Sequence, residues 1–189
     1  MHNQIKTDLV VIGGSAGSLQ VILETIKNLT VDLDFPIVLV LHRKAQAENI
    51  LTKLLQQFAP IQVIEIEDKT EIQDNIIYIV PSDYHLLFED KHKVSLDSSE
   101  KTNYSRPSID VTFKSAAEIF GDAVVAVLLS GANADGVEGL KYIKQNGGKV
   151  WIQDPETAEV DYMPRQALNN VDYDLIIRKG DLARQINNL

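Results

Sequence analysis

The chain has 189 residues, of which 44% are hydrophobic and 24% are charged, and these proportions are typical of a folded globular protein. Acidic residues number 27 against 18 Lys plus Arg, which gives a net charge of -9, and no basic stripe is present that could follow a phosphate backbone. The sequence therefore predicts one domain over residues 1–189 and argues against nucleic acid as a partner.

Several further classes of protein are excluded by what the chain lacks. It has no cysteine, and so no disulfide framework, no thiolate nucleophile and no Cys-ligated zinc. Its four histidines do not have the spacing of a metal site, and we expect neither a metal nor a cofactor. The N-terminus does not resemble a signal peptide, and no apolar run approaches the ~20 residues that cross a bilayer, so we expect a cytoplasmic protein.

Short apolar runs alternate with helical patterns along most of the chain. This alternation predicts an α/β fold in which crossover helices bury both faces of a doubly wound, mostly parallel sheet, a Rossmann-like three-layer α/β/α arrangement. The predicted elements, in chain order, are strand 8–12, helix 19–29, strand 36–41, helix 47–58, helix 110–120, strand 123–129, helix 137–145, strand 149–152, strand 174–177 and a short terminal helix.

Residues 61–96 have a different pattern. Short apolar runs at 62–66, 76–80, 84–88 and 93–96 are separated by polar residues and by Pro81. Such spacing is typical of antiparallel hairpins, which we place at one edge of the sheet.

A serine lies in a Gly-rich turn between the first predicted strand and the first predicted helix. The segment Gly13-Gly14-Ser15-Ala16-Gly17 has the GxSxG spacing of a nucleophile elbow, in which small neighbours permit a sharp turn that exposes the serine oxygen near unpaired amides. The same glycines would also let a phosphate approach those amides. Taken alone, the segment is compatible with a nucleophile, a phosphate site or a plain turn.

A histidine and an aspartate follow two other predicted strands. His42 comes directly after the strand 36–41 and, taken alone, is either a catalytic base or a solvated loop residue. Asp135 lies six residues beyond the strand 123–129 and, taken alone, is most simply the N-cap of the helix 137–145.

Ser15, His42 and Asp135 share one property. Each lies just past the carboxyl end of a predicted parallel strand, at the edge where open α/β sheets place their active sites. Ser15 would attack an ester carbonyl, His42 would take its proton and return it to the leaving group, and Asp135 would orient the imidazole. The chain order Ser, His, Asp disfavours the α/β-hydrolases, in which the acid precedes the histidine.

Six short motifs, in the same order and at compatible spacings, resemble those of the chemotaxis-receptor methylesterase family from residue 10 to about residue 189. They are the turn 13–18, Leu41-His42, Ile79-Val80-Pro81 with His85-Leu86, Arg106-Pro107-Ser108 with Asp110 and Phe113, the loop 130–136, and Met163-Pro164-Arg165.

The resemblance implies a serine hydrolase that removes methyl esters from glutamate side chains on the cytoplasmic helices of methyl-accepting receptors, with glutamine deamidation at the same sites. By motif position it places the nucleophile, base and orienting acid on Ser15, His42 and Asp135. The first predicted strand begins at residue 8, and we therefore expect a stand-alone catalytic domain without the receiver domain that often precedes it in the family.

The chain departs from the family pattern close to the expected chemistry. Ala16 stands where the family has Thr after the serine, and Ala132-Asn133 replaces Met-Gly in the acid loop. We place these three residues at the oxyanion or substrate site, where a backbone amide donor would survive the changes and a hydroxyl donor would not.

Three further residues are expected to contact the substrate. Met163 belongs to the late motif, and Arg106 and Arg165 would meet the acidic surface of a receptor. The alternative for both arginines is a cap or a pair with surface carboxylates.

Three functions from different classes remain open. The first is the methylesterase, which the ordered motifs and the converging triad favour. The second is a catalytically weak or altered-specificity relative that acts by binding receptors, as Ala16, Ala132 and Asn133 would permit. The third is a nucleotide-binding module, although the Gly-rich turn lacks a true GxGxxG.

Overall fold

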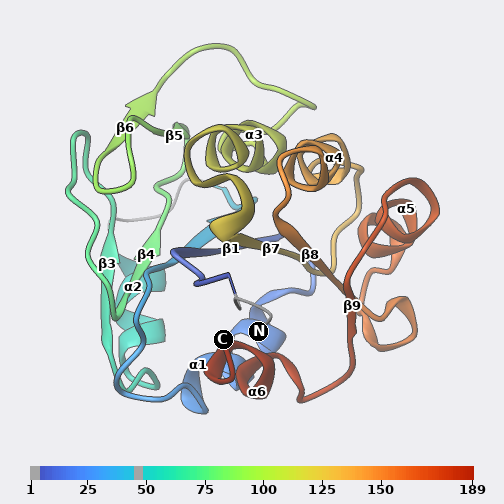
Figure 1. The fold of residues 1–189 in the computed structure, drawn as a ribbon, viewed down its shortest axis with the longest axis horizontal. Helices are drawn as coiled ribbons and strands as arrows, with labels where there is room; N and C mark the ends of the chain where they lie inside the picture. The colour runs from blue at the N-terminus through green and yellow to red at the C-terminus, as the bar shows by residue number, and fades with distance from the viewer. Residues whose placement is uncertain (1–4, 45–48) are drawn as a thin grey trace.

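A computed structural model describes residues 5–44 and 49–189 of the chain. Its centre is a seven-stranded sheet in which every neighbouring pair of strands is parallel, in the order β3-β4-β2-β1-β7-β8-β9 (Figure 1). The predicted doubly wound, mostly parallel sheet is therefore confirmed. Its strands are β1 Leu9–Gly14, β2 Ile37–Leu41, β3 Gln62–Glu65, β4 Ile76–Ile79, β7 Val124–Leu128, β8 Lys149–Gln153 and β9 Leu175–Ile177.

Helices cover both faces of the sheet. Every residue of β1, β2 and β7 is buried, which explains why these strands are continuous apolar runs in the sequence. Helices α1, α2 and α6 lie on one face and α3, α4 and α5 on the other, so that an apolar core forms on each side (Figure 1). Their bounds are α1 Leu19–Lys27, α2 Ile50–Gln56, α3 Ile109–Phe120, α4 Val137–Gln145, α5 Tyr162–Asn170 and α6 Leu182–Asn187, with short 3-10 helices η1 Gly121–Ala123 and η2 Pro155–Thr157. Within the described ranges, no helix has both the length and the apolar composition that crossing a bilayer requires.

The region 61–96 differs in part from its prediction as a set of antiparallel hairpins. β3 and β4 are parallel strands of the main sheet, and Ile77 of β4 pairs with Ile37 of β2. The later pair, β5 His85–Phe88 and β6 Val94–Asp97, is the predicted antiparallel hairpin, and it forms its own two-stranded sheet against α3. The prediction for β3 and β4 is wrong because the connection 66–75, which contains no helix, returns the chain to the amino end of the sheet before β4 begins. A short connection therefore does not imply antiparallel pairing here.

The predicted helices are present with small changes in their bounds. α4 has the predicted bounds, α1 and α3 differ by one or two residues at one end, and α2 begins at Ile50, while predicted residues 47 and 48 lie outside the described residues. α5 is not predicted from the sequence, because its Pro164 resembles a helix breaker. In the first turn, however, the missing proline N–H has no helical partner to lose.

α3 and α4 lie side by side over the sheet at very short range (Figure 1). Gly139 of α4 faces the start of α3, and a Cβ atom at this position would lie 2.6 Å from Cβ of Phe113 and 3.1 Å from Cα of Asp110. Atoms in a close-packed interior do not tolerate such approaches. The contact between the two helices therefore depends on the missing side chain of Gly139.

We expect Gly139→Ala to destabilise the protein by about 1–3 kcal/mol through overpacking, although the same change in an open helix interior stabilises by ~1 kcal/mol. Urea unfolding measures the difference. Glu138→Ala, at the exposed neighbouring position, is the control and should change the free energy of unfolding by less than about 0.5 kcal/mol. A Gly139→Ala variant as stable as the wild type would contradict this account of the packing.

Candidate active site

The carboxyl ends of three neighbouring strands meet where the predicted site residues lie. β1 lies between β2 and β7, and Ser15 and His42 directly follow β1 and β2. The N–H of His42 donates to the Gly14 carbonyl (3.1 Å), and the N–H of Ser15 donates to the Ser130 carbonyl (2.9 Å). β1 continues into α1 on one face, whereas β7 is reached from α3 on the other. The site therefore lies where the winding of the sheet reverses, the usual position for ligands in open α/β sheets.

Close contacts on both sides hold the serine turn. Gly17 has a φ of 78°, in the left-handed region, and the hydroxyl of Ser18 donates to the Ser15 carbonyl at 2.7 Å. On the other side, a Cβ atom at Gly131 would lie 3.0 Å from Cβ of Ser15 and 2.5 Å from Cε of Met163. Met163 is fully buried and Ser15 is partly exposed, so the serine lies at the surface above a buried methionine side chain.

Asp135 fixes the orientation of His42. Nε2 of the imidazole lies 2.6 Å from Oδ2 of Asp135, whose side chain is fully buried. Since an ionised carboxylate can only accept, Nε2 carries a proton, and in the neutral imidazole Nδ1 is the nitrogen with the free lone pair. In the serine proteases the two nitrogens have the opposite assignment. Across the described ranges, no hydrogen bond joins the Ser15 hydroxyl to the imidazole, and Nδ1 is the nitrogen left to accept one.

Five hydrogen bonds converge on the Asp135 carboxylate. Burial opposes its ionisation, but these bonds, that from His42 foremost, outweigh the burial and lower the pKa of Asp135. The group is therefore both charged and rigidly held at neutral pH. The donors are Nε2 of His42 (2.6 Å), Nδ2 of Asn103 (3.0 Å), the hydroxyl of Ser108 (2.8 Å), the N–H of Ile109 (2.6 Å) and the N–H of Asp110 (3.1 Å).

Asp135 and Asp110 each satisfy the first turn of the other's helix. Asp135 precedes α4 but accepts from the N–H groups of Ile109 and Asp110 at the start of α3. Asp110, in the first turn of α3, accepts from the N–H groups of Gly136 (2.9 Å) and Gly139 (2.6 Å) at the start of α4. Each carboxylate thus pairs donors that a helix N-terminus leaves free. The simple interpretation of Asp135 as the N-cap of α4 is wrong, because Gly136 occupies that position.

Asn103 joins the two carboxylates. Its Nδ2 donates to Oδ2 of Asp110 at 2.8 Å and to Oδ1 of Asp135 at 3.0 Å. Burial, and in addition the charge of Asp135, raises the pKa of Asp110, so Asp135 holds its negative charge more strongly than Asp110 does. Asn103 and Tyr104 both have left-handed backbone conformations, and the Tyr104 side chain projects into solvent.

The residues predicted at the oxyanion site flank the serine turn and the acid loop. Ala16 follows Ser15, and Ala132 follows Gly131, which packs against Ser15. Both alanines are exposed, and within the part of the chain that the structure describes neither donates a backbone hydrogen bond. The side-chain oxygen of Asn133 accepts from the N–H of Asp135 (3.0 Å), so this side chain shapes the acid loop.

The two predicted arginines lie in different places. Arg106 lines a cavity that also contains His42. Arg165 is an exposed residue of α5, and its guanidinium binds Asp161 (2.6 Å) and Glu156 (3.3 Å). Arg106 therefore lies at the site. Arg165 instead pairs with surface carboxylates, as the alternative to substrate contact predicts.

Three residues of the site have no role predicted from the sequence: Asn103, Ser108 and Asp110. Ser108 and Asp110 lie in a motif that carries the family resemblance, and Ser108 is the N-cap of α3, accepting from the N–H of Val111. A serine before a helical pattern is a recognisable cap signal. Asn103 belongs to an irregular loop with no local pattern that could have indicated its contacts.

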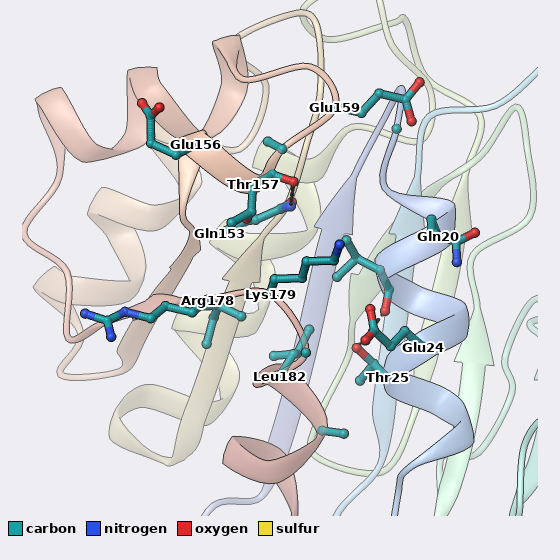
Figure 2. Close-up of a pocket in the computed structure, with 16 residues that line it drawn as sticks. Gln20, Glu24, Thr25, Gln153, Glu156, Thr157, Glu159, Arg178, Lys179 and Leu182 are labelled. Atoms are coloured by element: carbon teal, nitrogen blue, oxygen red, sulfur yellow. Dashed lines mark hydrogen bonds between the residues drawn. The ribbon is translucent and has the colours of Figure 1, made fainter.

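A second cavity, of about 460 Å³, adjoins the serine turn from the α1 side. Gly17 belongs to its lining, whereas His42 and Asp135 do not. Figure 2 shows Lys179 reaching across this cavity toward α1, Arg178 pointing away from it, and Glu159 at its upper rim. The cavity thus combines an apolar wall with charges of both signs and is separate from the His42–Asp135 pair.

The three-layer fold, together with a serine, a histidine and an aspartate at one edge of the sheet, defines an α/β protein with the composition of a serine-hydrolase site. Comparison with family models matches residues 10–186 to CheB methylesterase. The chain belongs to this family.

Individual relatives agree with this membership. A Leptospira interrogans protein that carries the name protein-glutamate methylesterase/protein-glutamine glutaminase is 41% identical over 174 residues, 91% of this chain and 90% of its own length. A protein of that name from Thermotoga maritima is 36% identical over 87% of this chain, which spans 48% of the relative. The crystal structure of the Thermotoga maritima CheB methylesterase catalytic domain matches with a TM-score of 0.88 at 33% identity, covering 97% of this chain and 99% of that one.

The pKa of Asp135 gives a prediction for stability against pH. Because folding lowers this pKa, the carboxylate contributes stability above its unfolded value of about 3.9, and the contribution is lost as the pH falls through the lower folded value. We expect Asp135→Asn to be about 2–4 kcal/mol less stable at pH 7, since an amide N–H would face the donors of His42 and Ile109. Its stability should also fall less steeply than that of the wild type below about pH 4.

Urea unfolding between pH 3 and pH 7 measures both effects. The matched control is Asp172→Asn, which makes the same change of charge at an exposed position. It should follow the wild-type curve. Parallel curves for wild type and Asp135→Asn in the acid range would show that Asp135 is not the group described here.

Proposed function

We propose that this chain hydrolyses the methyl esters of glutamate side chains on the cytoplasmic helices of methyl-accepting chemotaxis receptors. The observation that carries the proposal is the 2.6 Å hydrogen bond between His42 and Asp135, at the sheet edge where Ser15 also lies. The Asp135 carboxylate is buried and accepts five hydrogen bonds in all. Membership of the CheB methylesterase family and the names of the relatives support the substrate class. The place of action is then the cytoplasm, where these helices are found.

The first chemical step is attack by the Ser15 oxygen on the ester carbonyl. Nδ1 of His42 accepts the hydroxyl proton, while Nε2–H remains bonded to Asp135, whose charge stabilises the imidazolium. Asp135 can do this without moving, because four other donors hold its carboxylate in place.

Backbone amides are suited to stabilise the tetrahedral oxyanion. Ala16 follows Ser15, and Ala132 follows Gly131, which packs against Ser15; the N–H groups of both alanines form no hydrogen bond with another described residue. A backbone donor does not depend on the side chain at its position, so the departures at Ala16 and Ala132 are compatible with activity. Asn133 assists indirectly by holding the N–H of Asp135.

The reaction closes in two further steps. The imidazolium of His42 protonates the leaving methoxide, which departs as methanol and leaves the glutamyl group on Ser15 as an ester. His42 then activates water for attack on this ester, which releases the glutamate carboxylate and restores the serine. A glutamine side chain would follow the same path with ammonia as the leaving group, and we include this deamidation in the proposal.

Substrate contact is better assigned to Arg106 than to Arg165. Arg106 lines the cavity beside His42, whereas Arg165 is already engaged by two carboxylates on α5. Met163 contributes indirectly, because it is buried and packs against Gly131, which in turn packs against Ser15.

A fluorophosphonate probe and a methanol-release assay test the proposal. We expect the probe to label the wild type, and Ser15→Ala to abolish labelling and lower methanol release from methylated receptor by about 10⁴-fold or more. Ser98→Ala, which removes an exposed hydroxyl elsewhere, should label and turn over as the wild type does. An unlabelled wild type that still binds receptor would refute the esterase and favour the non-catalytic relative.

A further inference from the structure

A cavity of about 440 Å³ lies beside His42, and its charge is opposite in sign to that of the chain as a whole. Its wall contains four cations and one acid, although acidic residues outnumber Lys plus Arg by 27 to 18 overall. We call it the basic cavity. Its charged residues besides His42 are Arg43, Lys44, Lys101, Arg106 and Asp83.

The protein neutralises only part of this positive charge. Arg43 forms an ion pair with Glu65, at 2.8 Å. Arg106 instead donates through Nη1 to the backbone carbonyls of residues 98 and 99, both at 2.8 Å, which fixes the guanidinium without cancelling its charge. Nε of each arginine is buried and has no hydrogen-bond partner among the described residues. Because these Nε atoms are buried, only the terminal nitrogens of the two guanidinium groups can donate to a ligand in the basic cavity.

Two exposed lysines complete the rim. Within residues 5–44 and 49–189, Lys44 and Lys101 form no ion pair with a carboxylate, and they come from different segments. Lys44 follows β2 shortly after His42, and Lys101 lies in the loop between β6 and α3 that also carries Asn103. A ligand in the basic cavity would thus contact both the segment that carries His42 and the loop whose Asn103 donates a hydrogen bond to Asp135.

We propose that the basic cavity binds a carboxylate side chain of the substrate that neighbours the glutamyl ester, so that the enzyme selects esters within glutamate-rich helices. This inference rests on the proposed methylesterase function. Residues three or four apart lie on one helix face, separated by about one turn of 5.4 Å, so an ester and a carboxylate of the same helix can reach adjacent places on the enzyme. Lysine and arginine donors are suited to a carboxylate.

The net charge of the chain favours a local group of cations where an acidic substrate must dock. With a net charge of -9, the protein as a whole repels a glutamate-rich segment, and this repulsion slows its approach. A local group of cations beside His42 reverses the field where the ester must dock. Specificity and approach rate are the properties that charge complementarity of this kind improves most.

The test compares two helical peptide methyl esters that differ in one feature: glutamate, or glutamine, at the positions four residues before and after the ester. We expect Lys101→Glu to lower the ratio of kcat/KM for the acidic over the neutral peptide by about three- to tenfold, as for an exposed charge pair that is reversed. The wild-type ratio should also fall as salt is added. Lys6→Glu, exposed just before the amino end of β1, changes the net charge equally and should leave the ratio unchanged.

An unchanged ratio in Lys101→Glu, or an equal decrease in Lys6→Glu, overturns the inference. If neither peptide is hydrolysed by the wild type, the proposed function fails, and calorimetric binding of the two peptides decides the role of the basic cavity separately. If the wild type binds the acidic peptide more tightly than the neutral one, and Lys101→Glu removes this difference, the cavity is supported as a carboxylate site. Equal binding of the two peptides refutes it.

Discussion

Two buried carboxylates, each at the start of one helix and bonded to the first turn of the other, hold α3 and α4 together above the sheet. Asp135 accepts from α3 and Asp110 accepts from α4, while Asn103 donates to both. The helices must lie close for these bonds to form, and Gly139 provides the space. The position of His42 depends on this arrangement, because its imidazole binds the same carboxylate that closes the helix contact.

The sheet supplies the rest of the geometry. Parallel pairing of β2, β1 and β7 in register places the residues after their carboxyl ends at one edge, and bonds between these ends hold Ser15 to the β7 side and His42 to the β1 side. The serine is thus fixed by backbone contacts and the histidine by a side-chain acceptor. Together these two kinds of support assemble a polar site on strands whose own side chains are entirely apolar or glycine.

The sequence predicts those parts of the structure that depend on local patterns. The apolar runs of β1, β2 and β7 and the helical period of α4 identify the layers, and the positions after the strands identify the edge of the site. Apart from His42, the partners of Asp135 could not be derived in this way, because they lie 25 to 32 residues away in the chain and Asn103 stands in an irregular loop. Likewise, β3 and β4 look like a hairpin in the sequence, and only their neighbours in the sheet determine that they are parallel.

The exchange of carboxylates between α3 and α4 also bears on the order in which the chain acquires its structure. During synthesis α3 emerges first, but the acceptor for the N–H of Ile109 is delivered 26 residues later, by Asp135. α4, in turn, needs Asp110 for its own first turn. Since starting a helix is costly and isolated helices of this length are marginal, we expect neither helix to be stable until both have docked. The polar centre and the apolar layer of this face are therefore expected to form together.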